Sequence, residues 1–366
     1  MQFKGLPQRI RQSAACRVGL AMMGWLILIT GLHYWLNVES ESRPVVRMGY
    51  MPVITNLAAP LLDSATRDGI GLRFKAVKFA SFAEMAEALR HGQIEAAFMI
   101  APLSIVLHQQ GEAVKVVYIG NRHESTLVVR ADLAATDASG LAGKTIAVPM
   151  RYSGHLLSLL QLMEKNGLQD SVKLVEMNPP DMASALAVGS LDGYFVGEPF
   201  AALSVKNGAA RVLHYVEEVW PNFICNLVLV KQSFIESHPD RVATLVEGAV
   251  RSGIWAGNNT AQAARIAARY WNQPVELVEY ALSHPKNRIR YDRYLPRSEE
   301  MQHMADLMRH FGLIESADIG DLVDDRFCRR ADLNNVTGLE SIVRPDGGQR
   351  AVRLGLAGTV PSTPGH

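Results

Sequence analysis

The chain has 366 residues, 48% of them hydrophobic and 20% charged, with a formal net charge of +1. This length and apolar content exclude a disordered chain and predict one large or two medium domains. Subtracting the four cations that precede the first acidic residue leaves a net charge of −3. A mildly acidic body of this kind excludes a strongly basic face for nucleic acid.

The first feature along the chain is an apolar stretch, 18–37, that follows a short basic arm, 1–17. Up to Leu36 the stretch is apolar apart from Thr30 and His33. About 20 apolar residues span a bilayer, and cations before the stretch place the arm in the cytoplasm. The alternative is a cleaved signal peptide. Either way the body is expected outside, anchored to the periplasmic face of the bacterial inner membrane or secreted to the periplasm.

The three cysteines fit an exported protein that does not depend on a disulfide framework. Cys16 would stay on the cytoplasmic side of the membrane. Whether Cys225 and Cys328 pair is left open by the sequence.

Strands and helices alternate from residue 45 onward. Strands are expected at 45–50, 72–79, 94–100 and 114–119, and helices at 56–68, 82–91 and 102–110. Ser81 is expected to cap the second of these helices, with Glu84 completing a capping box. Such alternation predicts parallel sheets flanked by helices.

A second set of similar elements follows. Its strands are expected at 144–148, 172–177, 193–196 and, as a long return strand, 223–230, and its helices at 154–165 and 180–188. A helix opens at 238–240 and runs to about 255, after which the pattern is helical to about 325. The Gly/Pro-rich tail 344–366 is expected to be disordered.

Two similar α/β sets predict two lobes with a cleft between them. We expect the first lobe to contain 43–127 and 224–330 and the second to contain 128–223. Ligands in such sheets meet the carboxyl ends of the strands, where the amino ends of helices point.

No motif for catalysis or metal binding is evident. Gly143-Lys144-Thr145 resembles part of a phosphate-binding loop. That motif needs a second Gly five residues earlier, where this chain has Ala138, and it is followed by a helix, whereas a strand is expected here. The chain also lacks HExxH, a CxxC pair and GxSxG. The sequence therefore predicts neither an enzyme nor a cofactor or metal site.

Turns at the predicted strand ends supply the candidates for ligand contacts. These are Asn56, Ser81, Phe82, Ala101, His123, Ser153, Gly154, His155 and Glu198. Ser153 and Gly154 open a helix whose free N–H groups and positive end suit a small anion, or they form an ordinary N-cap. His155, as an imidazolium, would donate to an anion, or it caps a surface.

Four further residues have equally plain alternatives. Phe82 either forms a wall of the ligand site or belongs to the core. Glu198 either hydrogen-bonds a ligand or, in our preferred interpretation, braces a hinge. Arg122 and His123 are expected to be solvated loop residues, with ligand contact as the alternative.

Five segments in matching order resemble the nitrate/bicarbonate/sulfonate/taurine group of ABC substrate-binding proteins, a superfamily that includes thiamine-pyrimidine synthases. They are Gly-Tyr-Met-Pro (49–52), Lys-Phe-Ala-Ser-Phe (78–82), Ser-Gly-His (153–155), Asn-Pro-Pro-Asp-Met (178–182) and Asp-Gly-Tyr-Phe-Val-Gly-Glu-Pro-Phe (192–200). The resemblance covers about residues 45–310. It implies the type II periplasmic-binding-protein-like α/β fold, whose lobes close on a solute without chemistry, and an ABC permease and ATPase as partners.

The resemblance also bears on the solute. In nitrate-type members the segment resembling 78–82 carries a Trp that packs on the anion, whereas Phe82 has no N–H to donate. The strand end at 98–100 is apolar where polar contacts are expected. A larger organic anion or a partly apolar solute therefore fits better than nitrate.

Two other functions remain open. One is a membrane-tethered sensory domain, although an arm of about 17 residues is too short for an output domain. The other is a thiamine-pyrimidine-related binding protein or synthase. The synthases carry a cysteine-rich iron motif, and the three cysteines here are isolated.

Overall fold

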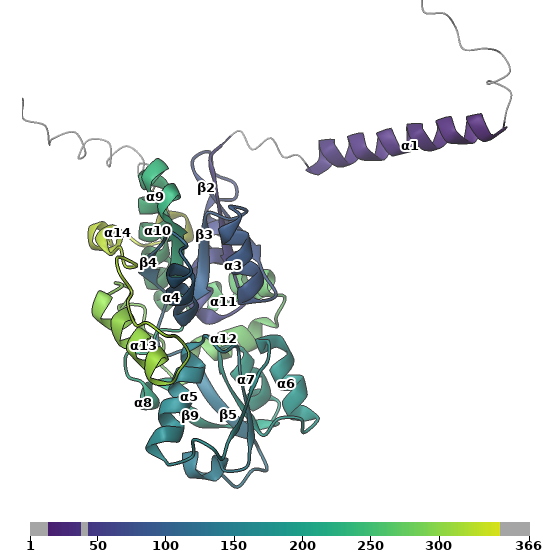
Figure 1. Ribbon diagram of the computed structural model, residues 1–366. Coiled ribbons are helices and arrows are strands. Elements are labelled where there is room, and N and C mark those ends of the chain that lie inside the picture. Colours follow the sequence, from purple (N-terminus) through teal and green to yellow (C-terminus); the bar gives the residue numbers. More distant parts are fainter. Residues whose placement is uncertain (1–13, 38–42, 345–366) are drawn as a thin grey trace, which may run out of the picture. The chain divides into compact units, whose positions relative to one another are not determined.

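The computed structural model describes residues 14–37 and 43–344, with side chains from 18 to 33 in the first of these segments. Helix α1 (Ala14–Asn37) belongs to a unit separate from the body, which begins at Val45. The two units are described separately, and Figure 1 shows both.

Helix α1 begins inside the expected arm, four residues before the expected apolar stretch. Its large apolar side chains are exposed, between 51% and 69% of their area for Val18 to Leu32. Among the helices that the structure describes, none is long and apolar enough to cross a membrane. The anchor over 18–37 therefore stays a prediction.

The first sheet of the body has five strands in the order β2-β1-β3-β10-β4. These are β1 (Val45–Tyr50), β2 (Arg73–Lys78), β3 (Ala96–Ile100), β4 (Val114–Ile119) and β10 (Asn226–Lys231). Its helical segments are η1 (Ile54–Asn56), α2 (Ala58–Thr66), α3 (Phe82–Arg90) and α4 (Ala101–Gln109). We call this sheet with its helices the first lobe.

The second sheet has the order β7-β6-β8-β5-β9. Its strands are β5 (Ser125–Arg130), β6 (Thr145–Val148), β7 (Lys173–Glu176), β8 (Gly193–Gly197) and β9 (Ala210–Tyr215). Its helical segments are η2 (Ala138–Leu141), α5 (Gly154–Lys165), α6 (Pro179–Ala187), α7 (Phe200–Lys206) and α8 (Val216–Val219). We call this part the second lobe.

Neither sheet is purely parallel, so that expectation was wrong. Strand β10 returns antiparallel between β3 and β4, and β5 lies antiparallel between β8 and β9. Each lobe thus receives one strand from a chain that has just crossed from the other lobe. Such a strand arrives in the opposite direction to the strands of the βα units and fits only as an antiparallel insertion.

The remaining helices form the C-terminal third of the body. They are α9 (Gln232–Ser237), α10 (Pro239–Asn258), α11 (Thr260–Trp271), α12 (Val275–Ser283), α13 (Ser298–His310), α14 (Arg326–Arg330) and η3 (Leu339–Ile342). The segments 284–297 and 311–325 contain no helix, contrary to the expected helical pattern. Arg344, the first residue of the expected disordered tail, makes ion pairs of 2.7 Å with Glu247 and Asp332; 345–366 lie outside the described residues.

Helix α13 contacts both lobes, and helix α12 contacts the second lobe. Helix α12 packs on α11 of the C-terminal third and on α7 of the second lobe. Helix α13 packs on α4 of the first lobe, and its last residue, His310, pairs with Glu164 of α5 in the second lobe at 2.9 Å. In Figure 1, α13 runs along one side of the body beside both lobes.

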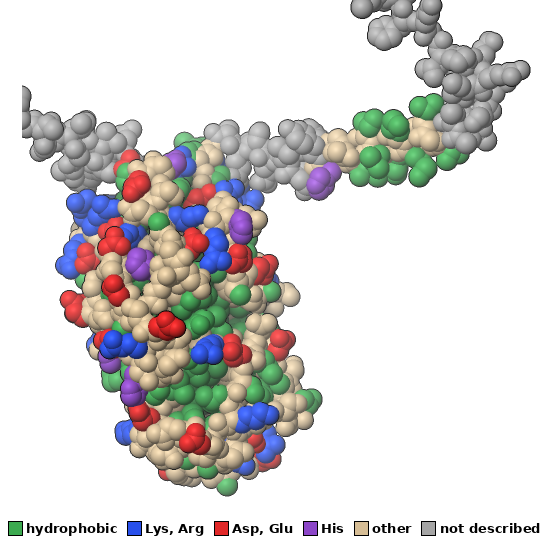
Figure 2. Space-filling model, viewed as in Figure 1, with side chains coloured by type: hydrophobic (Ala, Val, Ile, Leu, Met, Phe, Trp, Pro, Cys, Tyr) green, Lys and Arg blue, Asp and Glu red, His purple; other side chains and the backbone are tan. Residues whose placement is uncertain are grey.

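The apolar core is continuous from one lobe to the other. One cluster of buried side chains includes Met99 and Ile100 of the first sheet and Phe195 and Val196 of the second, with Phe223 on the connection between them. In the space-filling view, apolar side chains gather where the lobes meet (Figure 2). The lobes are therefore packed against each other in this structure.

Candidate functional site

Two short connections join the lobes. The first crossover, 120–124, leads from β4 to β5, and the second, 220–225, leads from α8 to β10. The amide of Ile54 in the first lobe donates to the carbonyl of Glu198 in the second at 2.8 Å. Asn121 of the first crossover donates from Nδ2 to the carbonyl of Ile54, also at 2.8 Å. Candidate residues from both lobes thus meet at the crossovers.

Asn56 and Ala101 lie at this junction and contact the return strand. Asn56 accepts from Nδ2 of Asn226 at 2.7 Å and donates to the carbonyl of Met51 at 3.1 Å. The amide of Ala101 donates to the carbonyl of Cys225 at 2.8 Å. Both residues are fully buried, so in this structure they hold the junction together.

Ser81 and Phe82 begin α3 as expected. Ser81 accepts from the amide of Glu84 at 3.2 Å, which is half of the expected capping box. The reciprocal bond comes from the amide of Ala80, at 3.3 Å from the Glu84 carboxylate, and not from Ser81. Phe82 is 6% exposed and belongs to the apolar cluster that spans the lobes.

Ser153 and Gly154 begin α5 beneath the second crossover. Ser153 accepts from the amide of Leu156 at 3.1 Å, the usual N-cap geometry. A Cβ placed on Gly154 would lie 2.6 Å from Cε2 of Phe223 and 3.2 Å from the carbonyl oxygen of Ile224. Only glycine fits under this contact, and the amino end of α5 is covered by the second crossover.

His155 is buried between the lobes and is neutral. Its Nε2 lies 2.8 Å from Oγ of Ser125, and its ring meets the edges of Phe195 and Phe223 at 5.6 and 5.5 Å between centroids. Burial lowers the pKa of His155 to about 3, because the apolar surroundings disfavour the charged ring. The expected imidazolium is therefore wrong at neutral pH.

Glu198 and Glu124 form a buried carboxyl pair at the ends of β8 and the first crossover. Glu198 accepts from Oγ1 of Thr126 and from the amide of Ala202, both at 2.8 Å. Its own amide donates to Oε2 of Glu124 at 3.0 Å. Burial raises the pKa of Glu198 to about 7 and also raises the pKa of Glu124. Glu198 thus braces the junction, the preferred interpretation of its position.

Arg288 supplies the positive charge nearest to this pair. It donates to the carbonyl of Ser125 and, at 3.1 Å, to Oγ1 of Thr126, and pairs with Glu217 at 2.9 Å. Since the residue follows α12, a C-terminal segment reaches into the second lobe. The local sequence around Glu124, Ser125 and Arg288 did not indicate that these residues belong together. The one available signal was that the acidic residue Glu124 directly precedes the apolar strand β5.

Arg122 and His123 differ from the expected solvated loop. Arg122 is 2% exposed and makes two bonds of 2.9 Å to the carboxylate of Glu300 in α13. It also donates to the carbonyl of Asn222 in the second crossover at 2.8 Å. His123 is half-buried, with Nε2 2.8 Å from the carbonyl of Pro221. The expectation for Arg122 was wrong because its charge is paired from outside the local sequence.

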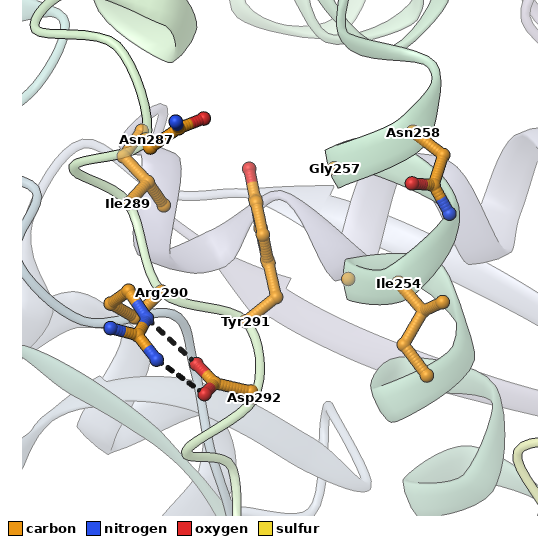
Figure 3. Close-up of a pocket in the computed structure, with 9 residues that line it drawn as sticks. Ile254, Gly257, Asn258, Asn287, Ile289, Arg290, Tyr291 and Asp292 are labelled. Atoms are coloured by element: carbon orange, nitrogen blue, oxygen red, sulfur yellow. Dashed lines mark hydrogen bonds and ion pairs between the residues drawn. The ribbon is translucent and has the colours of Figure 1, made fainter.

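Two surface cavities have volumes of about 430 Å³ each. In one, the Tyr291 ring faces Gly253 and Gly257 of α10 beside the Arg290–Asp292 ion pair (Figure 3). The other is lined by Arg122, Asn222, Asp292, Arg293, Leu295, Arg297 and Glu300. None of the nine predicted site residues lines either cavity.

Several buried polar atoms at the junction have no hydrogen-bond partner. They include Oγ1 of Thr55, Oδ1 of Asn121, Nδ1 of His155 and Oγ of Ser158. Unpaired buried polar atoms are costly, and in native proteins they mark places where a missing water, ion or ligand binds. The junction therefore contains buried polar atoms at which a water, an ion or a ligand can bind.

The structure answers one question that the sequence left open, which is whether two of the cysteines pair. Cys225 and Cys328 are both buried and both free, so they do not pair. Across residues 14–37 and 43–344, no cluster of three or more His, Cys, Asp or Glu side chains is arranged to hold a metal ion.

Residues 39–270 match the NMT1-like family, and the chain belongs to this family. Its homologues are ABC substrate-binding proteins for aliphatic sulfonates, taurine and nitrate. A Bacillus subtilis protein named for binding aliphatic sulfonates is 26% identical over 71% of this chain and 79% of its own length. The taurine-binding periplasmic protein of Escherichia coli is 28% identical over 47% of this chain and 54% of its own length.

Solved structures show the same fold. The alkanesulfonate-binding protein of Xanthomonas axonopodis pv. citri, bound to MOPS, superimposes with a TM-score of 0.64 at 19% identity, covering 76% of this chain and 98% of that one. A desulfurization enzyme also superimposes, with a TM-score of 0.57 at 15% identity over 79% of this chain and 99% of its own. The fold is thus the two-lobed periplasmic-binding-protein fold, which both binding proteins and an enzyme use.

Proposed function

We propose that this protein binds a small solute between its two lobes and delivers it to an ABC permease and its ATPase. The buried polar network that joins the lobes, with unpaired atoms on Thr55, Asn121 and His155, is the observation that supports this function. The nine residues predicted from the sequence are proposed to form or brace the solute site. Nitrate, sulfonates, taurine and bicarbonate are the solutes that the family suggests.

The proposed body lies on the periplasmic side of the inner membrane, with α1 as an uncleaved anchor. The exposed apolar side chains of α1 and the four cations that precede its apolar stretch at residue 18 support this placement. Transport is proposed over sensing because the homologues are periplasmic solute-binding proteins of ABC importers.

A thermal-shift screen tests the binding function. The panel is nitrate, bicarbonate, methanesulfonate, taurine, acetamide and ethylammonium, so that anionic, zwitterionic, neutral and cationic solutes are all present. Ligand at 100 times its Kd stabilises the folded state by about 2.7 kcal/mol, enough for a clear rise in melting temperature. Absence of any shift across the panel would contradict the proposal.

An enzyme is the second candidate, because a desulfurization enzyme shares the fold. Mass spectrometry of the stabilising solute after prolonged incubation separates the two functions. A binding protein returns the solute unchanged, whereas a new product assigns the protein to the enzyme class.

A further inference from the structure

A short chain of hydrogen bonds links a buried carboxyl group to the imidazole between the lobes. Oε1 of Glu124 lies 2.7 Å from Oγ of Ser125, and the same Oγ lies 2.8 Å from Nε2 of His155. Glu124 and Ser125 are 0% exposed and His155 is 2% exposed. Water therefore does not compete for these bonds. The other ring nitrogen of His155, Nδ1, is buried and has no partner.

A hydroxyl group has one hydrogen, so the chain has two proton arrangements. If Glu124 is ionised, Ser125 donates to the carboxylate, His155 donates from Nε2 to Ser125, and Nδ1 is left as an acceptor. If Glu124 is protonated, it donates to Ser125, Ser125 donates to Nε2, and the ring proton resides on Nδ1. The unpaired atom is then a donor. The protonation of Glu124 therefore sets the tautomer of His155 through Ser125, without direct contact between the carboxyl group and the ring.

We propose that Glu124, Ser125 and His155 form a relay in which the proton on Glu124 decides whether Nδ1 of His155 accepts from or donates to the solute. Ionised Glu124 selects a solute group with N–H or O–H, such as an amine or amide. Protonated Glu124 selects an acceptor, such as a sulfonate or carboxylate oxygen. The assignment of Nδ1 to the solute rests on the proposed function, whereas the relay itself exists in the ligand-free protein.

The surroundings of Glu124 act on its pKa in opposite directions. Burial raises its pKa, whereas Arg288, the hydrogen bond from Ser125 and the amide of Glu198 oppose that rise. The Cys225 thiol also faces Glu124, and burial raises the pKa of this thiol. Its Sγ lies 3.9 Å from Nε2 of His155. Because burial holds His155 neutral, only its tautomer changes as Glu124 titrates.

Nitrogen-15 NMR of the histidine rings in ligand-free protein tests the relay, because a protonated and an unprotonated ring nitrogen have different shifts. The spectrum of His155→Gln identifies the His155 signals. In the wild type, the ring proton should move from Nδ1 to Nε2 as pH rises from 5 to 9. Glu124→Gln should hold one tautomer throughout, and Ser125→Ala should uncouple the ring from the carboxyl group.

Two further variants separate the relay from a structural role. Ser125→Thr keeps the hydroxyl and should restore the tautomer change. Ser158→Ala removes another buried hydroxyl, on α5 but outside the relay, and should leave the change intact. If His155 in the wild type keeps one tautomer at every pH, the proposal is overturned, and this result does not depend on whether any variant folds. The proposal is also overturned if Glu124→Gln shows the same tautomer change with pH as the wild type.

The effect on solute selection is measured with whichever panel member binds. Its Kd should rise several-fold between pH 6 and pH 8 for methanesulfonate, taurine or nitrate and fall for ethylammonium, and Ser125→Ala should remove this dependence. An equal pH dependence in both proteins refutes the link to the solute. If no panel member binds, the proposed function fails together with that link, while the NMR result still decides the relay.

Discussion

Burial changes the protonation of two carboxyl groups in this protein, those of Glu124 and Glu198. Glu198 is 6% exposed, and each of its oxygens accepts one hydrogen bond. Two bonds do not replace the hydration that an ionised carboxylate loses, so burial raises its pKa from the usual 4.5 to about 7. The residue therefore makes the stability of the junction depend on pH.

We predict that this dependence disappears when the carboxyl group is replaced. Between pH 4.5 and 7 the folded state binds more protons at Glu198 than the unfolded state, so this residue's contribution to stability is lost as pH rises through that window. A rise of two to three pKa units corresponds to roughly 3 kcal/mol. Urea unfolding at pH 5 and pH 8 should show a smaller loss of stability in Glu198→Gln than in the wild type.

Glu315→Gln is the matched control for that measurement, because Glu315 is exposed. It should lose as much stability between the two pH values as the wild type. Equal losses in all three proteins would show that Glu198 does not titrate in this window.

At the scale of elements, Arg122 of the first crossover links α13 to the junction. Arg122 is 3% exposed in its side chain and pairs with Glu300 in the first turn of α13. It also donates to the carbonyl groups of Asn222 and Arg293. One guanidinium thus connects both crossovers to a helix that lies beside both lobes.

Arg122→Ala is expected to destabilise the protein by about 3 kcal/mol, because removal of one partner leaves a largely buried charge and several carbonyl groups unpaired. The control is Arg290→Ala. Arg290 pairs with Asp292 at 2.6 Å, but both side chains are exposed, so the loss should be about 0–1 kcal/mol. Chemical denaturation of both variants measures the difference, and similar losses would count against the role of Arg122.

At the scale of the whole molecule, the body and α1 are separate units. The proposed location of the body depends on whether α1 is an uncleaved anchor. If α1 is an uncleaved anchor, N-terminal sequencing of the protein from cell membranes should yield residues of the basic arm. A start near Ser40 or Glu41 would show that the apolar segment is a signal peptide and remove the anchor from the proposal.

Local patterns in the sequence determined most of the elements. Ser81 and Ser153 cap helices where the sequence places them, and the first strand has the expected bounds, because caps and hydrophobic alternation act within a few residues. Strands β5 and β9 were not predicted, although all but the last residue of β5 is buried. Strand β5 pairs with β8 and with β9, and the residues of both partners lie distant from β5 in the sequence.

Only the tertiary structure decided the chemistry of the junction. Glu124, His155 and Glu198 come from three different parts of the chain, and their contacts exist because β5 and β10 cross between the lobes. The same burial that brings them together removes water, and this desolvation makes His155 neutral and holds protons on the carboxyl groups. Residue types and spacing predicted the turns as a candidate site. The protonation of those residues depends on an environment that no local segment of sequence contains.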